Sequence, residues 1–171
     1  MEIATDRLTL RQISQEDWPL FLRLHTDPGV VALCFDIPNL QSVQEKFQER
    51  LLAWTADSGA WLCLVLVEHN TDEMIGVTGF SLKDGIAEVG YLLLPEYHGQ
   101  KYATESLDAL IEWAVSQLNI RDFKAIVTEG NIASERVLVK CGFKLTSITP
   151  NAYEIAGDLY SDLIFTMSVT S

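Results

Sequence analysis

The chain has 171 residues, 48% of them hydrophobic and 21% charged, which fits one globular domain and excludes a disordered protein. Lys and Arg total 12 against 24 Asp and Glu, and the formal net charge of −12 argues against direct DNA or RNA binding. Such a surface attracts basic polypeptides, polyamines and free amines, or it serves only to maintain solubility. No apolar run reaches membrane-spanning length, and the polar N-terminal segment does not look like a signal peptide.

The chain has three scattered cysteines, Cys34, Cys63 and Cys141. No two of them have the spacing of metal ligands or of a redox pair. This usage favours a reduced, cytoplasmic setting. The three histidines are also far apart in the sequence, so no metal site is expected.

In chain order, the first predicted element is a strand over residues 7–13, where apolar and polar residues alternate. Helices are predicted over residues 16–24 and 41–54, the second from apolar residues at helical spacing. Loops containing proline are expected around residues 27–29 and 36–39.

Three strands then follow closely, over residues 61–68, 74–82 and 86–94. The links between them are short and polar, which favours an antiparallel meander. A helix with a continuous apolar stripe is predicted over residues 102–118.

The last part of the chain begins with a strand over residues 123–128 and a helix that Asn131 caps and that ends at Gly142. Two more strands are expected over residues 143–148 and 160–169, separated by a loop over residues 149–159. With about seven strands, about four helices and no internal repeat or linker, the sequence predicts a single α+β domain over residues 1–171 with a largely antiparallel sheet.

The strand over residues 86–94 is almost wholly apolar, so it is expected to be central and covered on both faces. Glu88 is its one ionisable group besides Tyr91. Burial would raise the pKa of the Glu88 carboxyl and prepare it as a general base. The alternative is that Glu88 lies near the start of the strand and is half solvated. Gly90, two residues on, leaves room for a ligand to approach the backbone.

The same strand runs into a polar turn that holds Gly99 and Lys101, and a helix begins directly afterwards. Such a turn directs several backbone N–H groups, together with the positive end of the helix dipole, at one place. The motif favours an anionic ligand, typically a phosphate or pyrophosphate. Because the chain has a net charge of −12, the binding site of such an anion would need a locally positive field.

The helix that Asn131 caps carries Ser134 one turn inside its start. The Ser134 hydroxyl can donate a proton or bind a ligand, although a serine in a first helical turn is commonly only a tolerated polar residue.

Together these segments resemble the GNAT superfamily of acetyl-CoA-dependent N-acetyltransferases, and in particular the branch that acetylates the N-termini of ribosomal proteins at alanine or serine. The segments that carry the resemblance span nearly the whole chain: Thr5-Asp6-Arg7-Leu8-Thr9-Leu10-Arg11, Glu88-Val89-Gly90-Tyr91, the turn Gly99-Gln100-Lys101-Tyr102-Ala103-Thr104-Glu105, and Asn131-x-x-Ser134 through Lys140-Cys141-Gly142-Phe143.

The resemblance implies a mixed, mostly antiparallel twisted sheet with a V-shaped split between its fourth and fifth strands, where acetyl-CoA lies. It assigns the pantetheine arm to backbone groups of two residues, the pyrophosphate to the turn, and further contacts to the start of the later helix. The cofactor-binding residues so expected are Leu92, Leu94, His98, Gly99, Gln100, Lys101, Tyr102, Ala103, Thr104, Asn131 and Ser134.

Two residues depart from the family's turn, Gln/Arg-x-x-Gly-x-Gly/Ala, while Ala103 fits it. His98 stands where Gln or Arg is usual, and Lys101 stands where glycine is usual. A Cβ there can collide with phosphate oxygens or require a strained φ, but the lysine also supplies a cation.

For catalysis, the resemblance implies direct attack of a primary amine, with Glu88 as the base, acting through water. Ser134 is the expected acid, because Leu138 stands where some members carry a tyrosine. Acidic loops around Asp27, Asp36 and residues 153–158 suit a basic polypeptide N-terminus as the acceptor. They equally suit a polyamine or an aminoglycoside, and a CoA-binding module without transferase activity is a further alternative. The oligomeric state is left open between monomer and homodimer.

Overall fold

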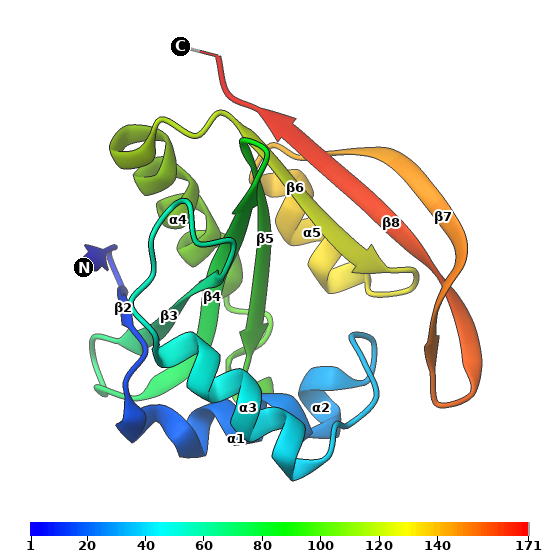
Figure 1. Cartoon of the computed structure of the whole chain (residues 1–171), viewed down its shortest axis with the longest axis horizontal. Helices are drawn as coiled ribbons and strands as arrows, with labels where there is room; N and C mark the ends of the chain where they lie inside the picture. Colours follow the sequence, from blue (N-terminus) through cyan, green and yellow to red (C-terminus); the bar gives the residue numbers. More distant parts are fainter. Residues whose placement is uncertain (171) are drawn as a thin grey trace.

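Within residues 1–170, which the computed structural model describes, eight strands form one sheet in the order β1-β2-β3-β4-β5-β6-β8-β7 (Figure 1). The strands are β1 (Glu2–Ala4), β2 (Leu8–Gln12), β3 (Trp61–Glu68), β4 (Met74–Lys83), β5 (Ile86–Leu93), β6 (Asp122–Thr128), β7 (Lys144–Ile155) and β8 (Asp158–Ser168). As the sequence predicts, β3, β4 and β5 form an antiparallel meander.

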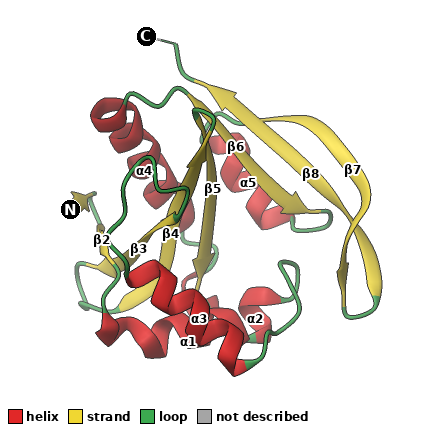
Figure 2. Cartoon of the chain, viewed as in Figure 1, coloured by secondary structure: helices red, strands yellow, loops and turns green. Residues whose placement is uncertain are grey.

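Five α-helices cover the two faces of this sheet (Figure 2). They are α1 (Trp18–Thr26), α2 (Pro28–Val31), α3 (Leu40–Leu51), α4 (Tyr102–Leu118) and α5 (Ile132–Lys140), with 3₁₀ turns η1 (Gln15–Asp17) and η2 (Pro95–Tyr97). The first three helices pack on one face, and α4 and α5 pack on the other.

Because side chains alternate in direction along each strand, the sheet has one hydrophobic core on each of its two faces. On β3, Leu62 and Leu64 belong to the core beneath α4 and α5, whereas Cys63 and Val65 belong to the core beneath α1 and α3. Successive side chains of a strand point to opposite faces, so the parity of a residue number tells which helices it meets.

The sheet splits between β5 and β6. These strands are the parallel pair of the sheet, and their pairing is confined to Ile86 with Asp122, Ala87 with Phe123 and Glu88 with Lys124. Beyond these pairs the strands diverge, so the V-shaped split is confirmed between the fourth and fifth predicted strands (Figure 1).

Three local expectations need correction. Residues 2–4 add the strand β1, and the expected loop at Asp27-Pro28-Gly29 contains the short helix α2, which Asp27 caps by accepting from the Gly29 N–H at 2.8 Å. Residues 149–159 are not a loop but the tip of the long β7–β8 hairpin. The pairing register shifts between Thr149 and Tyr153 and Asn151 has a φ of 50°, so a bulged strand passes through a segment whose composition resembles a loop.

In the part of the chain that the structure describes, no helix combines the length and the apolar character needed to cross a membrane.

Candidate functional site

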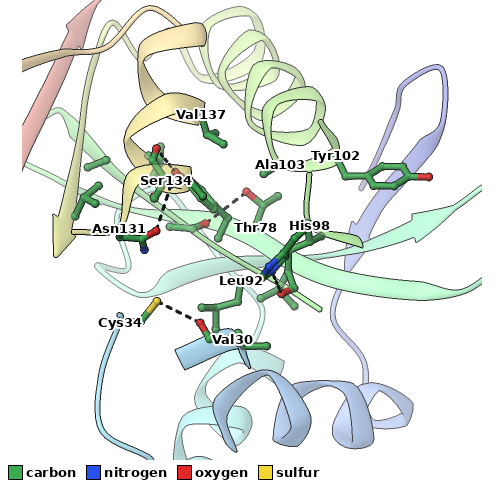
Figure 3. Close-up of a pocket in the computed structure, with 18 of the residues that line it drawn as sticks. Val30, Cys34, Thr78, Leu92, His98, Tyr102, Ala103, Asn131, Ser134 and Val137 are labelled. Atoms are coloured by element: carbon green, nitrogen blue, oxygen red, sulfur yellow. Dashed lines mark hydrogen bonds between the residues drawn. The ribbon is translucent and has the colours of Figure 1, made fainter. Parts of the chain in front are cut away.

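A cavity of about 800 Å³ lies where β5 and β6 part. Its wall includes the divergent halves of both strands, the turn after β5, the first turns of α4 and α5, and residues of α1, α2 and α3. Figure 3 shows Asn131 and Ser134 on one side of this space and Val30 and Cys34 on the other. The cavity therefore reaches both faces of the sheet through the split.

Along β5, odd-numbered residues direct their side chains to one face of the sheet and even-numbered residues to the other. Tyr91 points toward α5, where its hydroxyl lies 2.7 Å from the Ser134 Oγ. Gly90 faces the α1–α3 side, where a Cβ added to it would lie 3.3 Å from the ring of Trp61. One side therefore carries Tyr91 and Ser134, and the other offers a separate, aromatic space.

The backbone groups that face the split belong to odd-numbered residues of β5. The Leu94 N–H already donates to the Ile75 carbonyl at 2.9 Å, and the ladder with β4 pairs Val77 with Leu92. Because antiparallel pairs alternate, Tyr91 and Leu93 direct their amides toward the split instead. Leu92 does line the cavity, but the amide of Leu94 is not available for the pantetheine arm.

The turn between β5 and α4 has the backbone conformation of an anion-binding loop. Gly99 has a φ of 75° and Lys101 a φ of 68°, so lysine occupies the left-handed region where glycine is usual. Except for Gln100, whose side chain donates to the Glu96 carbonyl at 3.1 Å, the expected residues from His98 to Thr104 line the cavity. His98 lies 2.8 Å from the Leu93 carbonyl through its Nε2 and so joins the turn to the strand.

The N-terminal motif holds this turn in place. Glu105, in the first turn of α4, accepts hydrogen bonds from the Thr5 hydroxyl at 2.6 Å and from the Arg7 Nε at 2.8 Å. The Arg7 Nη2 also donates to the Gln100 carbonyl at 2.9 Å. Burial acts to raise the pKa of Glu105, but the hydrogen bonds from Thr5 and Arg7 outweigh it and hold that pKa below its usual value. The motif thus neutralises a carboxylate that would otherwise repel an anion.

Charge along the cavity wall is opposite to that of the whole protein. In residues 1–170 the wall contains four Lys or Arg side chains and no Asp or Glu: Arg50, Lys101, Arg136 and Lys140. An acidic protein thus presents a locally positive cavity, which fits the phosphates and the polar backbone of coenzyme A. Of these four, Lys101, Arg136 and Lys140 lie with the turn and α5, and together with the amides at the split they are the groups that would hold acetyl-CoA.

Ser134 and Tyr91 form the polar centre on the α5 side. Asn131 accepts from the Ser134 N–H at 3.3 Å, which confirms the predicted N-cap. Burial raises the pKa of Tyr91 to about 12, although its hydrogen bond to Ser134 acts to lower it. Tyr91 therefore keeps its proton at neutral pH and can donate to Ser134, which leaves the serine proton free for a ligand.

Glu88 lies on the opposite side from Ser134. Its side chain is 30% exposed, its Oε1 lies 3.7 Å from the Lys124 Nζ, and it is not among the residues that line the cavity. Of the two interpretations that the sequence allowed, the half-solvated carboxylate is the one observed. Glu88 shares the strand face of Gly90, two residues away, so it borders the aromatic side of the cavity.

The sequence left open whether Tyr91 and Trp61 belong to this site, and sequence reasoning missed His25 and Arg50. All four line the cavity, and they come from β5, β3, α1 and α3. Aromatic residues on buried strands usually belong to a core. The signal that could have pointed to Arg50 is a cation near the end of an otherwise amphipathic helix.

These features define a fold and cavity built for an anionic nucleotide cofactor, and comparison with known proteins supplies the family. The model of the acetyltransferase (GNAT) domain matches residues 7–144, and the chain belongs to this family. An uncharacterized N-acetyltransferase of Bacillus licheniformis, p20, is 26% identical over 168 residues that cover 96% of this chain and 94% of the relative.

Solved structures agree on the fold. RimL, a ribosomal L7/L12 alpha-N-protein acetyltransferase in complex with coenzyme A, superposes with a TM-score of 0.84 at 22% identity, covering 99% of this chain and 98% of that one. Spermidine N-acetyltransferase from Vibrio cholerae, in complex with CoA and spermine, gives 0.82 at 16% identity, covering 96% of each chain. The protein is therefore an acetyltransferase with acetyl-CoA as its co-substrate.

Proposed function

We propose that this enzyme transfers an acetyl group to a primary amine, namely the α-amine at the start of a polypeptide. The observation that carries the proposal is a cavity that passes through the split in the sheet. The anion-binding turn and Ser134 lie on one side, and an aromatic space beside Gly90 lies on the other. An acceptor on the second side can then meet a thioester held on the first.

Acetyl-CoA supplies an acyl carbon that an uncharged amine can attack. An α-amine has a pKa of about 8, against about 10.4 for a lysine side chain, so only a mild base is needed to deprotonate it. Glu88 is the proposed base, and it receives the proton through water because it borders the cavity rather than lining it. The amides of Tyr91 and Leu93 are the proposed donors to the developing oxyanion.

Ser134 is the proposed acid at the leaving group. Its Oγ lies 2.7 Å from the Tyr91 hydroxyl, and when Tyr91 is the donor of this hydrogen bond the serine proton is available to the leaving thiolate. Replacing Glu88 with Gln, or Ser134 with Ala, should each lower turnover by about 10²-fold. Ser116→Ala is the matched control, because this exposed serine bonds only within α4. Wild-type kinetics in both site variants would remove these roles.

The acidic loops provide little support for a cationic acceptor. Asp27 caps α2 and pairs with Arg23 at 3.4 Å, and Asp36 accepts from the Ala156 N–H at 2.7 Å. Neither lines the cavity, and no other Asp or Glu in residues 1–170 does, so the described wall offers no carboxylate to a polyamine or an aminoglycoside.

The direct test measures thiol release from acetyl-CoA with three sets of amines: ribosomal-protein N-terminal peptides, polyamines and aminoglycosides. The proposal expects turnover with peptides that have a free α-amine and none with the same peptides N-acetylated. Isothermal titration with acetyl-CoA is run in parallel. Tight binding without release from any amine would indicate a CoA-binding module instead, and no binding at millimolar acetyl-CoA would reject the proposed function itself.

A further inference from the structure

Arg50 is a cation on the acceptor side of the cavity that the proposed reaction does not use. It lies in the last turn of α3 and lines the cavity together with Trp61, which separates it from Gly90. The Arg50 Cζ is 5.7 Å from the centroid of the Trp61 ring. The guanidinium is therefore only one aromatic ring away from the centre of β5.

Protein groups leave this guanidinium almost without partners. Its side chain is only 16% exposed, and its one ion pair in residues 1–170 is with the neighbouring Glu49, at 3.9 Å, whose own side chain is 71% exposed. Over the same residues no hydrogen bond joins the guanidinium to another group, although it carries five N–H donors. Within the described residues none of its nitrogen atoms is both fully buried and without a partner, so the guanidinium keeps access to the cavity, but burial still lowers the pKa of Arg50 and the ring of Trp61 compensates the partly desolvated charge only in part.

A second cation increases that cost. Lys46 lies one helical turn before Arg50, and its Nζ is 5.7 Å from the centroid of the Phe35 ring. Burial first, and then the charge of Arg50, lowers the pKa of Lys46. Like charges four residues apart destabilise a helix. This end of α3 therefore holds positive charge that the described residues neutralise only in part, through the exposed Glu49.

The surrounding wall cannot supply the missing anion. The wall on the α1–α3 side consists mainly of aromatic and apolar residues such as Phe21, Phe35 and Trp61, with His25 held neutral by burial, and no Asp or Glu in residues 1–170 lines the cavity. The anion-binding turn and Ser134 belong to the α4–α5 side of the sheet, whereas Arg50 belongs to the α1–α3 side. The phosphates of the cofactor and the partner of Arg50 are thus on opposite sides.

We propose that Arg50 binds a carboxylate of the acceptor, so that the acceptor is an amine with an anionic group a few bonds away and an apolar or aromatic body. The inference rests on the proposed acetyl transfer and narrows its substrate class. A planar guanidinium binds a carboxylate through two parallel hydrogen bonds, which orients the rest of the molecule. The amine is then directed past Trp61 to Gly90, where the cavity passes through the sheet.

The carboxylate can come from two sources, which two pairs of acceptors distinguish. The first pair is L-phenylalanine and L-phenylalaninamide, in which the carboxylate belongs to a free amino acid. The second pair is the amidated peptides Ser-Asp-Ala and Ser-Asn-Ala, in which it belongs to a side chain next to the α-amine. Within each pair the shapes match and a carboxylate is exchanged for an uncharged amide. In the first pair this exchange also lowers the pKa of the neighbouring amine, an effect that is the same for the wild-type enzyme and for Arg50→Met.

We expect the wild-type enzyme to favour the carboxylate member of one pair by about tenfold to a hundredfold in kcat/KM, the range of hydrogen bonds to a charged group. Arg50→Met should abolish this preference, and Arg50→Lys should retain part of it. Lys46→Met is the matched control, because Lys46 lies on the same helix but does not line the cavity, and it should keep most of the preference. Equal rates within both pairs, or a preference that survives Arg50→Met, would overturn the inference while the acetyl transfer stood.

A measurement without turnover protects the test against a variant that does not fold. N-acetyl-L-phenylalanine should raise the Tm of the wild-type protein more than N-acetyl-L-phenylalaninamide does, because only the former offers the anion. Ligand-free Arg50→Met should melt at or above the wild-type Tm, since it removes an uncompensated buried charge. Equal Tm shifts with the two compounds, or a marked fall in the Tm of Arg50→Met, would show that Arg50 serves only the packing around Trp61.

Discussion

Acid should destabilise this protein through one buried histidine, His25. The residue is 5% exposed, its ring stacks on Phe21 at a centroid distance of 4.2 Å, and its Nδ1 lies 2.7 Å from the Phe21 carbonyl. Burial lowers the pKa of His25 from 6.5 to about 4, and the positive charges of Lys46 and Arg50 add to the effect. The folded protein thus holds this histidine neutral at a pH where the unfolded chain protonates it.

The sign and size of the effect follow from linkage. The unfolded state binds the proton below pH 6.5 and the folded state only near pH 4, so the contribution to stability is intact above pH 6.5 and is lost as the pH falls toward 4. At pH 5 the loss is about 2 kcal/mol, and near pH 4 it approaches about 3 kcal/mol. A loss of about 2 kcal/mol moves a urea midpoint by roughly 1 M for a protein of this size.

The assay is urea unfolding at pH 7.5 and pH 5, with wild type, His25→Gln and His69→Gln, the last a control at an exposed histidine. Contributions from groups other than His25 and His69 are common to all three proteins. The difference between wild type and His25→Gln therefore isolates His25. The reasoning would be refuted if His25→Gln lost as much stability between the two pH values as wild type and His69→Gln do.

Three further predictions concern the turn and the sheet. Lys101→Gly removes a left-handed lysine with a φ of 68°, so its free energy of unfolding should stay within about 1 kcal/mol of wild type. Loss of the cation should weaken acetyl-CoA binding about threefold to tenfold by calorimetry, and tighter binding would show that the lysine obstructs the site. Gly79→Ala should cost at least about 3 kcal/mol, because a Cβ there would meet the Leu62 carbonyl oxygen at 1.7 Å; a wild-type Tm would contradict this. Glu105→Gln weakens the hydrogen bonds to Arg7, so it should lower the Tm by about 3 °C and weaken acetyl-CoA binding. An unchanged dissociation constant for acetyl-CoA would show that the Arg7–Glu105 pair does not support the turn.

The acidity of the chain and its anionic co-substrate are compatible because charge is sorted in space. Asp and Glu outnumber Lys and Arg by 24 to 12 over the chain, yet the cavity wall has four of the cations and none of the acids in residues 1–170. Counting charges along a sequence cannot reveal this, since the four cations come from α3, the turn before α4, and α5. The bulk charge therefore says little about the ligand.

Local sequence patterns were sufficient for most elements of the fold and for the position of the turn between β5 and α4. The period of two over β3 to β5, the apolar stripe of α4, the cap at Asn131 and the glycine at residue 99 are all set by interactions within a few residues. The same patterns failed for the tip of the β7–β8 hairpin, where pairing with a distant strand overrides a loop-like composition.

Only the tertiary structure decided which residues share the site. The split between β5 and β6, the face on which each β5 side chain lies, and the meeting of Tyr91 with Ser134 depend on the register of strands far apart in the chain. Arg50 and Trp61 reach the cavity because α3 packs over β3, a contact that no local periodicity specifies. Short-range propensity determines the elements, whereas the choice between core and site depends on how long-range pairing buries one face and leaves another open.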